Sequence, residues 1–216
     1  EFRRVLFRSL RSPGRYLQLI GELDVTIAVG PPFALTLITR RQQRRPAEFD
    51  LSSVRSMLVG AEMIRPEVLD AFTEQFGRFG LAPGALCPTY GLAEATLAVT
   101  ANGRTDPYRV VALGDRSFTS CGSPVPGVEV RLGPDDELLV ASPALMDGYL
   151  DDPDATASTV ADGWLHTGDT AAIVDGEVVI TGRSKEMINR GGVRVPATEF
   201  ELALAGVDGL LADRIV

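Results

Sequence analysis

The sequence predicts an α/β fold in which helices pack on a largely parallel sheet, with a small antiparallel β unit after it in the chain. Up to residue 80, short apolar runs alternate with segments of helical spacing, as in strand–helix units. After residue 100, short strand-like runs follow one another closely and are separated by Gly and Pro. Near residue 182 the pattern changes again, which predicts that residues 183–216 begin a small α+β domain.

The individual elements of the first part follow from apolar spacing and from breaker residues. Proline at the start of a segment favours a helix start, because its missing N–H is unpaired there in any case. Helices are expected at Tyr16–Leu23, Phe33–Arg45 and Pro66–Phe79, and strands at Val25–Val29 and Ser56–Val59.

The second part is expected to be mainly antiparallel. Strands are expected at Val128–Leu132, Glu137–Ala141, Thr170–Val174 and Glu177–Thr181. Asp175-Gly176 between the last two runs predicts a hairpin turn, and Asp152 is the expected cap of a helix over residues 153–160. A strand pair and a helix over Pro196–Ala205 are expected at the end.

Composition excludes several classes of protein. The 216 residues are 45% hydrophobic and 23% charged, which is typical of a globular chain, and no apolar run is long enough for a membrane span. A net charge of −8 argues against a nucleic-acid surface. Two cysteines are too few for a disulfide framework, and no secretory signal is visible, so a cytoplasmic location is expected.

Three Gly-containing polar motifs occur in a fixed order: Thr89–Thr96, Gly163–Asp169 and Gly182–Ile188. Glu94, Asp169 and Arg183, one from each motif, are spaced by 75 and 14 positions. Together they resemble the adenylate-forming enzymes, which include acyl-CoA synthetases, fatty acyl-AMP ligases and the adenylation domains of peptide synthetases. The first motif is most similar to the fatty acyl-AMP ligase branch. The resemblance implies ATP-dependent activation of a carboxylic acid, with a fatty acid favoured, and transfer of the acyl group to CoA or to the phosphopantetheine of an acyl or peptidyl carrier protein.

In the first motif the resemblance assigns Glu94 as the Mg²⁺ carboxylate and Tyr90 as the aromatic residue stacked on adenine. Gly91 would let the backbone approach the nucleotide. Many family members carry Thr immediately before the glutamate, whereas this chain has Ala there. Thr96 is expected to take part in catalysis, but whether Thr96 or Thr89 supplies the missing hydroxyl stays open. Without the resemblance, the segment would read as a capped helix start with a core tyrosine.

Other nucleotide contacts are implied elsewhere. Gly60, Ala61 and Glu62 form a strand-to-helix turn that would line the adenine pocket through its backbone. Asp169 would bind both ribose hydroxyls, since one carboxylate can accept from two donors. Arg183 would place a permanent positive charge near the ribose and phosphates.

The single histidine, His166, is interpreted as structural, and Trp164 as a core residue. Lys185 falls at the family's hinge between large and small domains, although an ordinary exposed ion pair with Glu186 is the alternative. Gly192 and Arg194 match the loop that faces the active site during thioester formation.

The ends of the chain suggest a piece of a longer protein. Residues 1–9 resemble a translated sequencing adapter, with a basic N-terminal arm as the alternative. Residues 10–182 are expected to be the C-terminal part of the large AMP-binding domain, and residues 183–216 the start of the mobile one. The family's phosphate loop and catalytic lysine would lie outside this chain, so the chain alone is expected to be inactive.

The acyl tunnel is expected to include Val29, Pro32, Phe33 and the Leu92–Leu97 stretch. Fatty acyl-AMP ligases usually carry an insertion that disfavours CoA, but here Arg109–Phe118 runs almost directly into Cys121. This absence favours CoA as an acceptor. Two alternatives remain: a non-catalytic nucleotide-binding or interaction module that has kept the fold, and, more weakly, a luciferase-like oxygenase.

Overall fold

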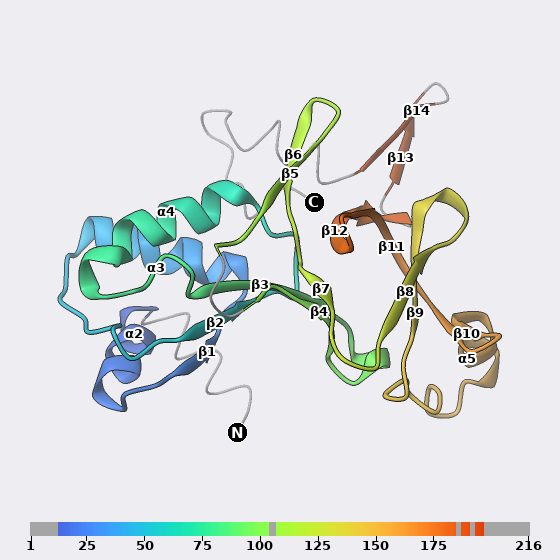
Figure 1. Ribbon diagram of the computed structural model, residues 1–216, viewed down its shortest axis with the longest axis horizontal. Helices are drawn as coiled ribbons and strands as arrows, with labels where there is room; N and C mark the ends of the chain where they lie inside the picture. Colours follow the sequence, from blue (N-terminus) through green and yellow to red (C-terminus); the bar gives the residue numbers. More distant parts are fainter. Residues whose placement is uncertain (1–12, 104–106, 185–186, 191–192, 197–216) are drawn as a thin grey trace.

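The computed structural model describes residues 13–103, 107–184, 187–190 and 193–196, and for the last two ranges the backbone alone. Two β units follow one another (Figure 1). The first carries the helices at the left of the view, and the second, at the right, consists mainly of antiparallel strands. The predicted α/β fold with a second antiparallel β unit is therefore confirmed.

The first unit is a five-stranded sheet in the order β1-β2-β3-β4-β7. Its strands are β1 (Ile27–Val29), β2 (Ser56–Val59), β3 (Leu86–Gly91), β4 (Ala98–Ala101) and β7 (Ser123–Pro124), and its helices are α2 (Pro13–Glu22), α3 (Pro32–Arg44) and α4 (Pro66–Phe76). Helix α3 contacts both α2 and α4. The 3₁₀ turns η1 (Gly77–Phe79) and η2 (Ala93–Ala95) follow α4 and β3.

This sheet is less parallel than expected. The pairs β1–β2 and β2–β3 are parallel, whereas β3–β4 and β4–β7 are antiparallel. The physical reason is the short connection after β3, because a parallel neighbour needs a crossover of a dozen or more residues. The sequence motif around Tyr90 thus lies on a tight reversal of the chain.

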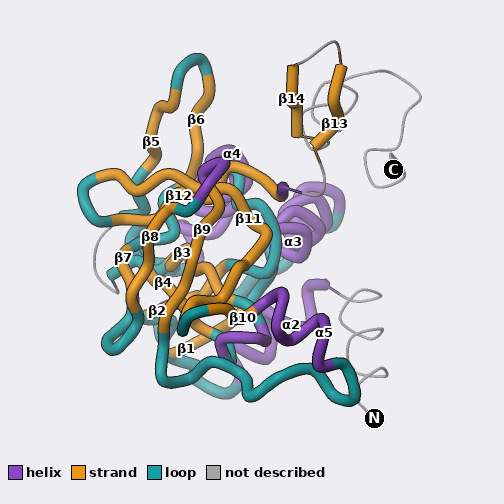
Figure 2. Tube along the Cα trace, turned by 90° about the vertical axis from the view of Figure 1, so that its right-hand side faces the viewer, coloured by secondary structure: helices purple, strands orange, loops and turns teal. Residues whose placement is uncertain are grey.

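The second sheet runs β10-β11-β9-β8, with β12 paired to β11. Its elements are β8 (Glu129–Leu132), β9 (Glu137–Ala141), α5 (Pro153–Thr159), β10 (Val160–Ala161), β11 (Trp164–Val174) and β12 (Glu177–Arg183), with η3 (Pro134–Asp136) before β9. A hairpin of β5 (Val110–Leu113) and β6 (Arg116–Thr119) projects from the body in both views (Figures 1 and 2). The strands β13 (Met187–Arg190) and β14 (Val193–Pro196) form the expected strand pair, which is antiparallel.

Most predicted elements occur within a few residues of their expected bounds. Asp152 caps α5 by accepting a 2.9 Å hydrogen bond from the N–H of Ala155. Asp175 and Gly176 both have positive φ, as the predicted hairpin turn requires. Five bounds differ by two residues or more: α2 begins at Pro13 rather than Tyr16, β1 begins at Ile27 rather than Val25, α4 ends at Phe76 before a 3₁₀ turn, β11 begins at Trp164 rather than Thr170, and β12 ends at Arg183 rather than Thr181. The expected helix Pro196–Ala205 lies outside the described residues.

Two large apolar clusters hold these units together. One joins the helices to the first sheet, with Phe72, Phe76 and Leu86 fully buried in it. The other joins β4 and η2 to the second sheet. Tyr90 and Ile180 pack against both clusters, so Tyr90 lies where the two units meet.

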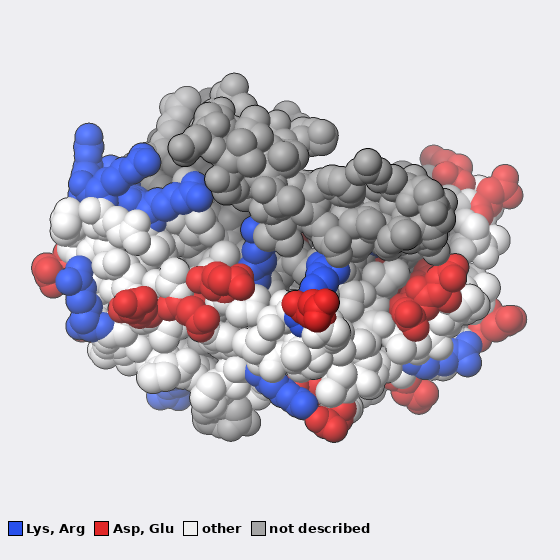
Figure 3. Space-filling model, turned by 90° about the horizontal axis from the view of Figure 1, so that it is seen from above, with Lys and Arg blue, Asp and Glu red and all other residues white. Residues whose placement is uncertain are grey.

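The surface charge is uneven (Figure 3). On the face shown, basic side chains gather at the left, over the helices, and the right-hand end is mainly acidic. Within the described part of the chain, none of the helices combines the length and the apolar character that a membrane span needs.

Candidate nucleotide site

Residues from three strands form one hydrogen-bonded network at the junction of the two units. The hydroxyl of Tyr90, on β3, donates to Oδ2 of Asp169 at 2.6 Å. Arg183 Nε donates to the other oxygen, Oδ1, at 3.0 Å. Asp169 and Arg183 are cross-strand partners on β11 and β12, so strand register fixes this second contact. We call these residues the Tyr90–Asp169–Arg183 network.

Register shifts in the pairing of β11 affect the direction of the Asp169 side chain. The pairing of β11 shifts register against β9 between His166 and Thr170, and against β12 immediately after Thr170. Such bulges bend a strand and redirect side chains, and they are frequent beside functional sites. Thr167 stabilises the irregularity, since its hydroxyl donates to the carbonyl of Leu138 at 2.7 Å and accepts from the N–H of Asp169 at 3.1 Å.

The network combines a buried carboxylate with an accessible cation. Asp169 is 5% exposed, whereas 65% of the Arg183 side chain is exposed. Burial, and then the negative charge of Asp169, raise the pKa of Tyr90 above its ordinary value, so its hydroxyl stays a donor. Each carboxylate oxygen has two acceptor positions, and each uses one here. Asp169 therefore retains the capacity to accept from two further hydroxyl groups.

Glu94 lies in η2, four residues after Tyr90, and is held separately. Its Oε1 accepts a 2.7 Å hydrogen bond from the hydroxyl of Tyr149, and its carbonyl accepts from the N–H of Met146 at 2.7 Å. Among the described residues Glu94 makes no hydrogen bond or ion pair with the Tyr90–Asp169–Arg183 network. The roles assigned from the sequence imply that Glu94 and this network face one cleft, and this stays a prediction.

The residues present fit a weakly ligated Mg²⁺ ion better than a protein-enclosed metal. No group of three or more His, Cys, Asp or Glu side chains in the described part of the chain could hold a metal. Mg²⁺ commonly binds through one or two carboxylates together with substrate phosphates and water. A single carboxylate with one occupied oxygen, as at Glu94, suits that mode.

Neither threonine proposed as the missing hydroxyl is free in the structure. Thr96 Oγ1 donates to the carbonyl of Ala144 at 2.7 Å, and Thr89 Oγ1 donates to the carbonyl of Val59 at 3.2 Å. Either hydroxyl would have to leave a backbone carbonyl before it could donate to a phosphate. The structure therefore leaves the choice between them open.

Two of the expected site residues have structural contacts that the sequence did not reveal. A Cβ atom on Gly91 would lie 1.7 Å from the carbonyl oxygen of Leu97, so the close backbone approach at Gly91 is to its own chain. Glu62 Oε1 accepts a 2.5 Å hydrogen bond from the N–H of Phe33. Because Pro31 and Pro32 lack N–H groups, the N–H of Phe33 is the first backbone donor at the start of α3.

The strand-to-helix turn itself lies against the first motif. A Cβ atom on Gly60 would meet the carbonyl and hydroxyl oxygens of Thr89 at 2.7 and 2.8 Å. Ala61 has φ = 74°, a left-handed conformation that side chains adopt rarely. The turn and Thr89 are therefore packed together, and their contact with adenine stays a prediction.

The structural interpretation of His166 is supported by its contacts. His166 Nδ1 lies 3.0 Å from Glu137 Oε2, and Glu137 Oε1 accepts from the N–H of Gly168 at 2.9 Å. Trp164 was wrongly placed in the core: it is partly exposed, and the Arg131 guanidinium lies 4.1 Å from its ring centroid. Glu137 and Tyr149 were missed, because neither belongs to a motif singled out in the sequence.

The remaining expectations concern the hinge, the thiol-acceptor loop and the acyl tunnel. Lys185 and Gly192 lie outside the described residues, and of Arg194 only the backbone, in β14, is described. Of the expected tunnel residues, Pro32 is buried, whereas Val29 and Phe33 are 66% and 44% exposed.

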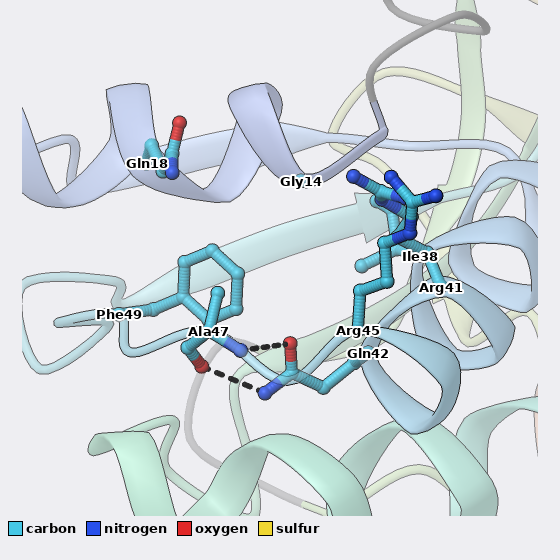
Figure 4. A pocket seen from close by; sticks show the side chains of 8 residues that line it. All are labelled: Gly14, Gln18, Ile38, Arg41, Gln42, Arg45, Ala47 and Phe49. Carbon is cyan, nitrogen blue, oxygen red and sulfur yellow. Dashed lines mark hydrogen bonds between the residues drawn. The ribbon is translucent and has the colours of Figure 1, made fainter.

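The small cavity shown in Figure 4 is a different feature. It has a volume of ≈ 70 Å³, and its lining residues are Gly14, Gln18, Ile38, Arg41, Gln42, Arg45, Ala47 and Phe49. The Gln42 amide bonds both the N–H and the carbonyl of Ala47 there. Ligand pockets usually measure about 300–1,000 Å³, and no lining residue belongs to the Tyr90–Asp169–Arg183 network. This cavity is therefore not the candidate nucleotide site.

Comparisons with known proteins agree with the motifs. The family model described as "AMP-binding enzyme" matches residues 3–150. A Rhodococcus jostii protein named 3-[(3aS,4S,7aS)-7a-methyl-1,5-dioxo-octahydro-1H-inden-4-yl]propanoyl:CoA ligase is 34% identical over 94% of this chain and 37% of its own length. The medium-chain-fatty-acid–[acyl-carrier-protein] ligase JamA of Moorena producens is 34% identical over 82% of this chain and 36% of its own length.

The structural comparison gives the same result. A structure from studies of fatty acyl-adenylate ligases of E. coli and L. pneumophila has a TM-score of 0.84 and 29% identity, covering 93% of this chain and 41% of that one. The chain thus spans well under half the length of these proteins.

Proposed function

Since this chain belongs to the AMP-binding enzyme family, we propose that it forms part of an enzyme that activates a carboxylic acid with ATP and transfers the acyl group to a thiol. In the first step a carboxylate oxygen would bond to the α-phosphorus of ATP and pyrophosphate would leave. In the second, a thiolate would bond to the acyl carbon and AMP would leave. The observation that carries this proposal is the Tyr90–Asp169–Arg183 network, in which residues from three separate motifs meet at one carboxylate.

Each residue has a role that suits its environment. Asp169 binds the ribose hydroxyls, since it is buried and still has two acceptor positions. Tyr90 holds that carboxylate in place and offers its ring to the adenine. Arg183 is exposed enough to turn toward phosphate oxygens, and its charge is permanent. Gly60, Ala61 and Glu62 line the adenine pocket beside Thr89.

Glu94 would supply the carboxylate for Mg²⁺. Bound Mg²⁺ would neutralise negative charge on the phosphate oxygens. Thr96 belongs to the same loop and is proposed to help position the α-phosphate. Lys185 is proposed as the hinge between the large and small domains. Gly192 and Arg194 are proposed to belong to the loop that contacts the acceptor thiol.

Fatty acids are the favoured substrate class, since one relative is named a medium-chain fatty acid ligase and the aligned structure belongs to fatty acyl-adenylate ligase studies. For the acceptor we propose CoA. The hairpin β5–β6 turns within two residues, and Ser120 to Gly122 lead directly from it into β7. Among its described residues, this connection contains no inserted segment of the kind that disfavours CoA in fatty acyl-AMP ligases.

The test uses the complete gene product that carries this chain. Carboxylate-dependent exchange of pyrophosphate into ATP should occur with a fatty acid and should fall by about 10²–10³ in Glu94→Gln, by analogy with the loss of one electrostatic donor. Exposed Glu129 on β8 provides the matched control, and Glu129→Gln should keep full exchange. An absence of exchange in the unsubstituted protein would favour a non-catalytic module.

Two further measurements separate the finer parts of the proposal. With CoA added, the complete protein should form acyl-CoA. Release of acyl-AMP without acyl-CoA, together with transfer to a carrier protein, would contradict the proposed acceptor. The 216-residue chain alone should show no exchange, because the family's phosphate loop and catalytic lysine have no match in its sequence.

A further inference from the structure

The loop that carries Glu94 is held by a segment that lies 50 residues further along the chain. We call residues 144–149 the clamp segment. Three of its groups bond the loop: the Ala144 carbonyl accepts from Thr96 Oγ1, the Met146 N–H donates to the Glu94 carbonyl, and the Tyr149 hydroxyl donates to Glu94 Oε1, all at 2.7 Å. Backbone and side chain of Glu94 are thus fixed from the same side.

The loop needs such support because its backbone is strained. Thr96 has φ = 65° and ψ = −55°, and the N–H of Leu97 donates to the carbonyl of Ala95 at 2.7 Å. This is a γ-turn of the rare, strained kind, and conformations of this type cost about 1–3 kcal/mol unless the surrounding structure enforces them. The bonds from Ala144 and Met146 flank the turn and provide that enforcement.

The position of Tyr149 is in turn set by α5. Its N–H donates to Thr156 Oγ1 at 2.9 Å, and that hydroxyl donates to the Asp152 carbonyl at 2.8 Å. A Cβ atom on Gly148 would lie 2.9 Å from two atoms of the Thr156 side chain, so the chain passes close to the helix there. The start of α5 therefore determines where the Tyr149 hydroxyl can reach.

The hydrogen bond from Tyr149 occupies one of the two carboxylate oxygens of Glu94 and leaves the other available. Oε1 is taken by Tyr149, and Oε2 has no hydrogen-bond partner among the described residues. A carboxylate that is held by one oxygen has already lost its rotamer freedom before a cation binds. Its second oxygen can therefore bind the cation at a smaller cost in conformational entropy.

We propose that Tyr149 is a positioning residue for Glu94, fixing the carboxylate so that Oε2 faces the bound divalent cation. The proposal rests on the metal role of Glu94 in the proposed function. It adds a residue from outside the three motifs, and it places the clamp segment between α5 and the reaction centre.

The test measures cation binding directly. The complete gene product is mixed with the α,β-methylene analogue of ATP, whose bridging carbon prevents adenylation, and Mn²⁺ binding is followed by electron paramagnetic resonance. Loss of a hydrogen-bond partner of a metal ligand typically weakens metal binding about 10–100-fold. Since Tyr149 is 38% exposed and water can replace its hydroxyl, Tyr149→Phe should weaken Mn²⁺ binding about tenfold. Its pyrophosphate exchange should need more Mg²⁺ but approach the normal maximum at high Mg²⁺.

Tyr108 provides a matched control. Its hydroxyl also donates to a carboxylate, that of Asp70 on α4, and neither residue belongs to the candidate site. Tyr108→Phe should leave Mn²⁺ binding unchanged, whereas Glu94→Gln should weaken it more than Tyr149→Phe does. Thermal unfolding of the three variants checks that each remains folded.

The outcomes separate the two proposals. Weakened binding in Tyr149→Phe and Glu94→Gln, with Tyr108→Phe unchanged, supports the positioning role. If Glu94→Gln weakens binding and Tyr149→Phe does not, the positioning role is wrong and the proposed function stands. If neither change alters Mn²⁺ binding, Glu94 is not the metal carboxylate and the positioning role of Tyr149 is wrong, whereas the proposed function fails only if the unsubstituted protein shows no pyrophosphate exchange.

Discussion

Tyr90 and Asp169 are 79 residues apart in the chain, yet the tyrosine hydroxyl donates to the carboxylate at 2.6 Å. The contact crosses from the first sheet to the second, and Tyr90 packs against the apolar clusters of both. The candidate site therefore depends on the docking of the two β units. Any change that separates them should disorder the site before it unfolds either unit.

The ribose role of Asp169 can be tested through the sugar itself. A hydrogen bond to a charged group contributes about 1.5–3 kcal/mol, so in the complete gene product Asp169→Asn should weaken ATP binding roughly 10–100-fold. The preference for ATP over 2′-deoxy-ATP should shrink as well. Isothermal titration calorimetry with both nucleotides measures this.

The control for that change is Asp175→Asn, at the turn of the same strand pair. Asp175 pairs with Arg109 at the surface, so its loss should leave both nucleotide affinities unchanged. An Asp169 variant that keeps the full preference for ATP over 2′-deoxy-ATP would show that this carboxylate does not contact the 2′-hydroxyl.

The partly buried Tyr90 hydroxyl should make the free energy of unfolding depend on pH in alkaline solution. The pKa of Tyr90 is raised above the ordinary 10.0 by burial and by the charge of Asp169. Above pH 10 the unfolded chain therefore loses this proton while the folded chain keeps it. The free energy of unfolding should fall by about 1.4 kcal/mol per pH unit from this group, and the loss should be absent below pH 10.

Urea unfolding from pH 8 to pH 11 measures the effect. Tyr90→Phe should be less stable at pH 8, because Asp169 loses a donor, but its stability should decline less steeply above pH 10. The other tyrosines contribute equally to both proteins, so the difference in slope isolates Tyr90. Identical slopes would mean that the hydroxyl of Tyr90 is not held in the folded state.

Gly91 should tolerate no side chain. Gly91→Ala would place a methyl group 1.7 Å from the Leu97 carbonyl oxygen, and the contact is backbone, so the β3–β4 reversal must open. We expect a loss of about 3 kcal/mol or more in the free energy of unfolding. Gly77→Ala is the control, since nothing lies within 4 Å of its added Cβ and its effect should be within about 1 kcal/mol. Equal stability of the two variants in urea would contradict the close approach.

Glu62 should stabilise the start of α3. Its carboxylate accepts from the N–H of Phe33 and lies at the positive end of the helix dipole. Glu62→Ala should therefore lower the free energy of unfolding by about 1 kcal/mol. Glu67, in the first turn of α4, has no such bond recorded within the described structure, and Glu67→Ala should cost less. Urea unfolding compares the two; equal losses would argue against the capping role.

The sequence alone determined the local structure of this protein. The bounds of β2 and β9, the cap at Asp152 and the turn at Asp175-Gly176 all follow from interactions between residues a few positions apart, and such interactions act in any chain that contains them. The resemblance carried by the three motifs also indicated the family, and the family model matches residues 3–150, which include the first of these motifs.

Tertiary structure decided what those residues contact. The register of β11 with β12 brings Arg183 to Asp169, the reversal after β3 presses Gly91 against Leu97, and the position of α5 brings Tyr149 to Glu94. Tyr149 and Glu94 are 55 residues apart, so no local spacing could predict their contact. The predicted hairpin turn brings β11 and β12 together, but the irregularity after Thr170 decides that Arg183 is the partner of Asp169. A pattern of residues can therefore indicate which groups carry the chemistry, while only packing selects the neighbours that orient them.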